Sequence, residues 1–148
     1  MESPNITIDQ FALLALKANV HDPQNLLATN WSISTSVCNW IGVSCGSKHL
    51  RVTALSLSIM SLTGTIPPHL GNLSFLSWLD IKNNSFQGSL RVELTHLHWL
   101  KYISFAKNNF IGEIPSWFDS FPKLESLFLH DNYFSGVLPS SLCYLPKL

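Results

Sequence analysis

Residues 100–123 read LKYISFAKNNFIGEIPSWFDSFPK, and the pattern of this segment occurs four times along the chain at a fixed interval. The four segments begin at residues 52, 76, 100 and 124, so the period is 24 residues. Apolar side chains occupy relative positions 1, 4, 6, 11, 15, 19 and 22 in every segment, and glycine occupies position 13. Such self-similarity predicts a solenoid, in which each unit buries its apolar face against the next.

The spacing within one unit predicts where the core lies. Positions 4 and 6 differ by two, so both side chains point into the core from a short strand, while positions 3, 5 and 7 point outward. The apolar positions match the leucine-rich-repeat template L-x-x-L-x-L-x-x-N-x-L. Position 9 is Met60 in the first unit and Asn84, Asn108 and Asn132 in the others. We expect a ladder of asparagines, beginning at the second unit, whose amides satisfy the backbone groups that each turn leaves unpaired.

The segment before the repeats has the length and polarity pattern of a terminal cap, which a solenoid needs to cover its first unit. The stretch TIDQ at 7–10 has the form of a capping box that opens a helix. Asp22 followed by Pro23 predicts a second short helix around Leu26–Leu27. The expected apolar face of the first helix consists of Phe11, Leu14, Ala15 and Ala18.

These patterns divide the chain into a cap and a repeat region. The expected divisions are the cap at 5–50, four repeats within 51–147 (52–75, 76–99, 100–123 and 124–147), and Leu148 as the first position of a fifth.

Composition and charge restrict the class of partner. Nine basic and nine acidic residues cancel, and only 12% of the residues are charged, so nothing favours nucleic acid or an anionic membrane. The apolar content of 46% is ample for a core, and no apolar run reaches the roughly 20 residues of a membrane span. A surface poor in charge and rich in aromatic residues suggests contact with proteins, peptides or sugars.

Four Asn-x-Ser/Thr triplets favour secretion, because a chain of this length contains one or two by chance. The candidate glycan acceptors are Asn5, Asn30, Asn72 and Asn83.

The cap and the repeats together resemble the N-terminal ectodomain of plant leucine-rich-repeat receptor-like Ser/Thr kinases. The residues that carry the resemblance are DQFALLALK at 9–17, CNWIGVSC at 38–45, RVTALSL at 51–57 and LTGTIPPHLGNL at 62–73. The L-x-G-x-I-P segment is typical of the plant-type repeat. The sequences of these motifs are most similar to those of the subfamily that includes immune receptors for bacterial peptides.

The resemblance implies an α/β fold: a right-handed superhelical solenoid with a concave parallel sheet, a second short sheet and a helical cap. It implies an extracellular or secreted module that binds a peptide or protein ligand, or a leucine-rich-repeat co-receptor, through the concave face. The family's kinase motifs do not occur in this sequence, so we expect no enzyme activity and no cofactor in this chain. The alternative within the same fold is a soluble inhibitor of a cell-wall-degrading enzyme, similar to polygalacturonase inhibitors.

Outward-facing strand positions supply the candidate ligand-binding residues. Trp78, Tyr102 and Phe128 lie diagonally across neighbouring strands, where the period aims them away from the core. Large aromatic side chains with few rotatable bonds are favoured at protein interfaces, although scattered aromatic residues on a protein surface are also common. The full candidate set is Trp78, Asp80, Lys82, Tyr102, Ser104, Phe128 and His130.

Other chemistry has little support. His96 and His98 flank Leu97 at a unit junction, and no Cys or carboxylate stands at a spacing that completes a metal site. A hydrolase would need titratable residues clustered in one cleft, whereas the carboxylates fall at different repeat positions. Cys143 is expected to be a half-buried free thiol, with a disulfide to a partner as the alternative.

Cys38 and Cys45 lie within the cap with six residues between them. In the extracellular chain that the resemblance implies, a disulfide between them persists, and their spacing is neither C-x-x-C nor that of a usual zinc knuckle. We expect this bond to hold Trp40 and Val43 as a plug at the open end of the core.

Overall fold

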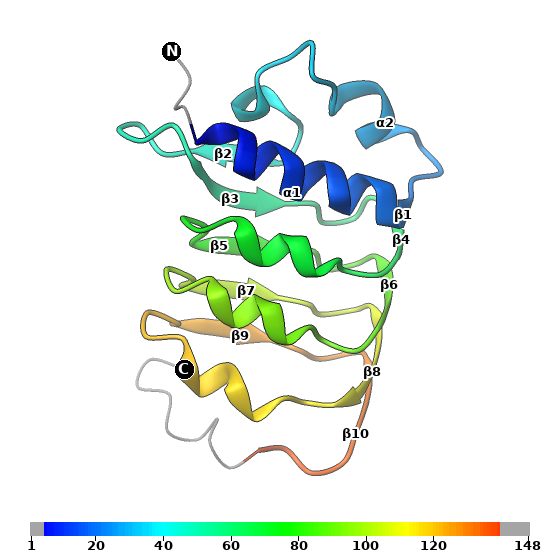
Figure 1. The fold of residues 1–148 in the computed structure, drawn as a ribbon. Coiled ribbons are helices and arrows are strands. Elements are labelled where there is room, and N and C mark those ends of the chain that lie inside the picture. Colours follow the sequence, from blue (N-terminus) through cyan, green and yellow to red (C-terminus); the bar gives the residue numbers. More distant parts are fainter. Residues whose placement is uncertain (1–4, 140–148) are drawn as a thin grey trace.

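The repeated segments form stacked coils in a computed structural model that describes residues 5–139 (Figure 1). Each coil has a short strand in one sheet and a short strand in a second sheet, and in the first three coils a 3-10 helix leads to the next coil. The helical cap covers the first coil (Figure 1). The predicted leucine-rich-repeat solenoid with an N-terminal cap is confirmed.

The first sheet carries the outward-facing positions 3 and 5. Its order is β2-β3-β5-β7-β9; the cap strand β2 pairs antiparallel with β3, and the repeat strands pair in parallel. The register equals the sequence period, so Leu55 pairs with Leu79 and Leu79 with Ile103. The strands are β2 (Val43–Cys45), β3 (Val52–Ser56), β5 (Trp78–Asp80), β7 (Tyr102–Ser104) and β9 (Ser126–Phe128).

The second sheet lies where each coil passes its glycine. Gly64 has a φ of +127°, and a β-carbon there would collide with the Asn19 carbonyl oxygen, so no other residue fits this position. The sheet order is β1-β4-β6-β8-β10, with β1 antiparallel to β4. The strands are β1 (Val20–His21), β4 (Thr63–Gly64), β6 (Ser85–Gly88), β8 (Asn109–Glu113) and β10 (Tyr133–Ser135).

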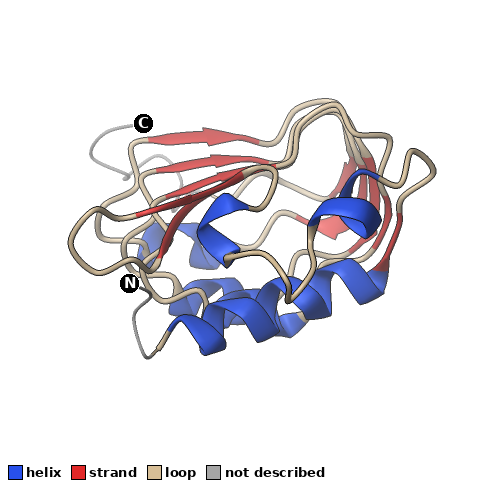
Figure 2. Ribbon diagram, turned by 90° about the horizontal axis from the view of Figure 1, so that it is seen from above, coloured by secondary structure: helices blue, strands red, loops and turns tan. Residues whose placement is uncertain are grey.

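Helix α1 and the 3-10 helices of the repeats line the side of the stack opposite the first sheet, whereas the short cap helices lie over its end (Figure 2). Apolar side chains from both sheets and from the helices fill the space between them, with Phe86, Phe110 and Phe134 stacked at centroid distances of 6.4 Å. The α-helices are α1 (Ile6–Asn19) and α2 (Leu26–Asn30). The 3-10 helices are η1 (Val37–Asn39), η2 (Pro68–Asn72), η3 (Val92–His96) and η4 (Ser116–Ser120).

The predicted apolar face of α1 is wrong for Phe11 and Ala18, whereas Leu14 is partly buried and packs against the core. Phe11 is 71% exposed and Ala18 is exposed, because the buried carboxylate of Asp9 turns the other side of the helix toward the first coil. The buried residues of the helix are Ile6, Asp9, Ala12, Leu13 and Leu16.

The predicted helix starts also differ from the structure. Helix α1 begins one residue before Thr7, so the proposed capping box lies inside the helix and makes no side-chain cap. Helix α2 begins at Leu26 rather than at Pro23. The Asp22 carboxylate nevertheless accepts hydrogen bonds from the backbone N–H groups of Leu26, Leu27 and Ala28, so it caps this helix from outside.

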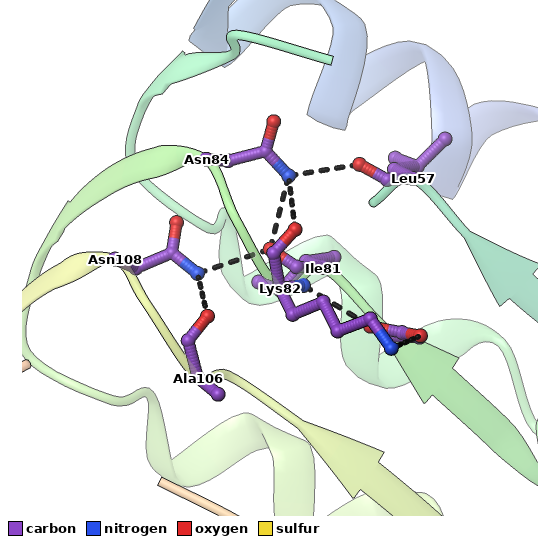
Figure 3. Close-up of polar contacts among 7 residues, drawn as sticks. Leu57, Ile81, Lys82, Asn84, Ala106 and Asn108 are labelled. Carbon is purple, nitrogen blue, oxygen red and sulfur yellow. Dashed lines mark hydrogen bonds and ion pairs between the residues drawn. The ribbon is translucent and has the colours of Figure 1, made fainter. Parts of the chain in front are cut away.

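The asparagine ladder joins consecutive coils (Figure 3). Asn84 Oδ1 accepts hydrogen bonds from the backbone N–H groups of Met60 and Leu62 in the preceding coil, at 3.1 and 3.0 Å. Its Nδ2 donates to backbone carbonyls of its own and the preceding coil. Asn108 and Asn132 repeat this arrangement one and two coils further on. The turns of adjacent coils are therefore linked by side-chain amides.

The cap closes over the core with two tryptophans. Trp40 is 2% exposed and stacks on the fully buried Trp31 at a centroid distance of 5.4 Å. Both indole N–H groups donate to backbone carbonyls of the cap. The predicted disulfide between Cys38 and Cys45 is present, and it encloses Trp40 and the buried Val43. Trp31 was not predicted as part of the plug, because it lies outside the cysteine pair.

Candidate ligand-binding face

A row of aromatic rings crosses three strands of the first sheet. Trp78 on β5 and Tyr102 on β7 occupy paired positions, and their rings stack with centroids 3.8 Å apart and planes within 4°. Phe128 on β9 continues the row, with its centroid 5.6 Å from that of Tyr102. Trp78 and Phe128 are 43% and 41% exposed, so the row lies on the surface.

Two of the candidate polar residues are shielded. Asp80 is 5% exposed and Ser104 is 1% exposed, although both stand at outward positions of their strands. The prediction equated an outward strand position with an accessible side chain, and for these two short side chains it is wrong. Asp80 instead positions Lys82, because its carboxylate accepts the Lys82 backbone N–H at 3.1 Å and lies 3.7 Å from Lys82 Nζ.

A pocket of about 420 Å³ opens beside the aromatic row. Tyr102 and Phe128 provide aromatic lining, and the basic lining consists of Lys107 and of Lys82, whose ammonium group is paired with Asp80. This combination favours a ligand that presents an apolar group next to an acidic one. The lining residues are Lys82, Asn83, Tyr102, Ser104, Ala106, Lys107, Phe128 and His130.

Lys107 lines the pocket but was not among the predicted binding residues. It stands at repeat position 8, just after the strand, and the predicted columns stopped at position 7. Asn83 and Lys107 both have a φ of +57°, in the left-handed region, and both line the pocket. Position 8 has a positive φ in every unit, Ile59 and Asp131 included, but the four residue types share no turn signal from which the sequence could have identified it.

Of the four candidate glycan acceptors, Asn83 lies at the pocket. Asn5, Asn30, Asn72 and Asn83 are all exposed. A glycan on Asn83 would therefore stand at the pocket rim, whereas Asn5 and Asn30 belong to the cap and Asn72 ends η2. Glycosylation at each of the four sites stays a prediction.

The remaining candidates lie apart from this face. His96 ends η3 and His98 is exposed, and within residues 5–139 no three metal-binding side chains come together. Cys143 and Leu142 lie outside the described residues. Within the described part of the chain, none of the helices has the length and apolar character needed to span a bilayer.

Comparison with known proteins identifies two sequence families and several close structures. The profile of the Leucine rich repeat N-terminal domain matches residues 8–46, and that of the Leucine Rich Repeat matches 99–121 and 123–145. The Arabidopsis thaliana LRR receptor-like serine/threonine-protein kinase EFR is 46% identical over 80 residues, which cover 53% of this chain. The match spans only 8% of EFR.

Solved ectodomains match over most of the chain. The BIR2 ectodomain from Arabidopsis thaliana has a TM-score of 0.89 and 33% identity, and the match covers all of this chain and 78% of that one. The Arabidopsis receptor kinase HAESA, in complex with the peptide hormone IDA and the co-receptor SERK1, matches with a TM-score of 0.66 and 33% identity. That match covers 90% of this chain and 27% of the other.

Proposed function

This chain belongs to the family of plant leucine-rich-repeat receptor-like kinases, and from this premise we propose that it recognises a peptide or protein ligand outside the cell. The solved relatives that it matches over most of their length are ectodomains, so the chain itself is not an enzyme. Its role is to hold a ligand through non-covalent contacts.

The stacked pair of Trp78 and Tyr102 is the observation that carries this proposal. Their rings lie on the sheet face, outside the apolar core, so core packing does not account for them. Rigid aromatic side chains of this kind supply large contact area at a small entropic penalty, and they dominate the energetics of many interfaces.

The ligand we propose is a short extended segment that crosses β5, β7 and β9. Three strands span about 10 Å from first to last, which accommodates a few residues of a peptide. An apolar side chain would pack against Tyr102 and Phe128, and an acidic group would lie near Lys107, because the Lys82 ammonium is already paired with Asp80. Further contacts of a longer ligand would fall on neighbouring repeats of a complete receptor.

A second ectodomain is the partner we propose for the complex. HAESA binds its peptide hormone together with the co-receptor SERK1, as the solved complex records. By analogy, a ligand held on the concave face of this chain would recruit a co-receptor, and the intact receptor would pass the signal to a kinase.

Selection from a display library of random peptides tests the proposal. Peptides enriched on the secreted chain are synthesised, and their affinity is measured by calorimetry for the wild type and for the variant Trp78→Ala/Tyr102→Ala. We expect the variant to bind at least about tenfold more weakly, because it removes the centre of the contact surface.

The control is Phe11→Ala, which removes a more exposed aromatic ring, 71% against 43% for Trp78, from the outer side of α1. This variant should keep the affinity of the wild type. Equal affinity of the wild type and the double variant for every enriched peptide would refute the concave site.

A further inference from the structure

A second groove lies at the edge of the first sheet, away from the aromatic row of the concave face. It has a volume of about 280 Å³ and is lined by side chains that stand before or at the start of β3, β5 and β7. We call it the edge groove. Its lining residues are His49, Thr53, Phe75, Ser77, Trp99 and Lys101.

Packing in the apolar core does not account for the aromatic residues of the edge groove. Trp99 is 51% exposed. Phe75 and Trp99 occupy the last position of the first and second repeats, and the third repeat has Lys123 there, so this position is not part of the apolar pattern of the core. His49 stacks on Phe75 with a centroid distance of 5.5 Å. The groove therefore presents apolar ring surfaces to solvent at the junctions between coils.

Cationic groups accompany these rings. Lys101 lines the groove, and Lys123 Nζ lies 5.7 Å from the centroid of the Trp99 ring. The Arg51 guanidinium lies 5.0 Å from the Phe75 centroid, but its charge is already paired with Asp9. Lys101 and Lys123 are therefore the basic groups beside the indole. Glu125 stands at the repeat position of Lys101 one coil further on, and its backbone N–H donates to the Lys101 carbonyl at 2.8 Å, so one acidic residue adjoins the two lysines without lining the groove.

The backbone provides few hydrogen-bonding groups to the edge groove. The N–H groups of Ser77 and Lys101 donate to the carbonyls of Thr53 and Ser77, respectively, so they are not available to pair with a peptide strand. The polar lining consists of side-chain hydroxyl, imidazole and ammonium groups. A sugar has an apolar C–H face and a polar edge. Such a ligand fits a groove that offers aromatic rings for packing and side-chain groups for hydrogen bonding better than an extended peptide does.

We propose that the edge groove binds one or two units of an acidic oligosaccharide, whose sugar carboxylate pairs with Lys101 or Lys123. The volume lies near the lower end for small-ligand sites, so it accommodates a short segment rather than a long chain. The site shares none of its lining residues with the concave pocket, and the proposal does not depend on peptide recognition there.

Calorimetry with defined probes tests the proposal on the full chain. The probes are a hexamer of 1,4-linked galacturonic acid, the neutral hexamer of 1,4-linked galactose, and hexaglutamate. We expect the acidic sugar to bind at least about tenfold more tightly than either of the others, because it alone supplies both the ring face and the carboxylate. The indole N–H signal of Trp99 in the nuclear magnetic resonance spectrum should shift on binding.

Variants separate the contributions of ring and charge. Trp99→Ala and Lys101→Gln/Lys123→Gln should each weaken binding of the acidic hexamer by about tenfold, and Trp99→Phe should weaken it less. The controls Phe11→Ala and Arg91→Gln lie outside the groove and should bind like the wild type. Circular dichroism verifies that each variant is folded.

Four results would overturn the proposal. They are equal binding of the neutral hexamer, equal binding of hexaglutamate, an unchanged affinity in Trp99→Ala, and no binding of the acidic hexamer at about 5 mM, where even a weak site is occupied.

Discussion

Asp9 and Arg51, 42 residues apart in the sequence, form a bidentate ion pair inside the molecule, with two N–O distances of 2.8 Å. Asp9 is fully buried, Arg51 is 6% exposed, and the carboxylate also accepts the backbone N–H of Val52 at 2.9 Å. The hydrogen bond to Asp9 raises the pKa of Arg51, against the lowering effect of burial, and so favours the charged guanidinium. The pair joins α1 to β3 and so fixes the cap on the first coil.

Replacement of Asp9 by Ala should lower the free energy of unfolding by about 3–5 kcal/mol, because it leaves a buried guanidinium and a backbone N–H without their acceptor. Urea denaturation measures the change. Replacing both residues, as in Asp9→Ala/Arg51→Met, should recover part of the loss, since the buried charge is then removed.

The control is Glu93→Gln, which breaks the exposed contact between Arg91 and Glu93. Exposed pairs contribute about 0–1 kcal/mol, so this variant should unfold like the wild type. A loss of less than about 1 kcal/mol in Asp9→Ala would contradict the role assigned to the buried pair.

Asn108 should be the most sensitive position of the asparagine ladder, because it is only 4% exposed. Its Oδ1 accepts the Phe86 N–H, and its Nδ2 lies within 3.2 Å of three carbonyl oxygens. Asn108→Ala leaves these groups unpaired and should lower the free energy of unfolding by about 2–4 kcal/mol. Asn132→Ala, at a more exposed site, should have a smaller effect in the same urea titration. An equal effect at both positions would show that burial does not set the contribution.

The disulfide should stabilise the cap without shaping either binding site. For so short a loop, the loss of chain entropy on cross-linking corresponds to about 2–3 kcal/mol. Cys38→Ser/Cys45→Ser should reduce the unfolding free energy by this amount in a thermal or urea titration. Neither cysteine lines the concave pocket or the edge groove, so peptide and sugar affinities of the folded variant should stay unchanged. Unaltered stability would show that Trp31 and Trp40 close the core unaided.

The 24-residue period made the strand columns and the asparagine ladder predictable, because a solenoid converts sequence register directly into spatial register. The face of α1 could not be predicted, because Asp9 is buried by a partner that follows far along the chain. Lys107 and Trp99 were missed for another reason. They stand in turns, where side-chain direction depends on a positive φ or on packing between coils rather than on strand alternation.

The last described coil should be the least protected against hydrogen exchange. Its core residues Leu127 and Leu129 are partly buried, whereas Ile103 and Phe105, at the equivalent positions one coil earlier, are 1% and 0% exposed. Local opening follows the number of buried apolar contacts, so we expect the β9 amides to exchange faster than those of β7.

Mass spectrometry of deuterium uptake in the 148-residue chain measures this difference. Appending one further repeat with the sequence of residues 100–123 at the matching register should slow exchange in β9, because the added coil covers Leu127 and Leu129. Uniform protection of β7 and β9 in the original chain would show that the last coil is already closed. An unchanged β9 after the extension would show that its exchange is not limited by missing neighbour contacts.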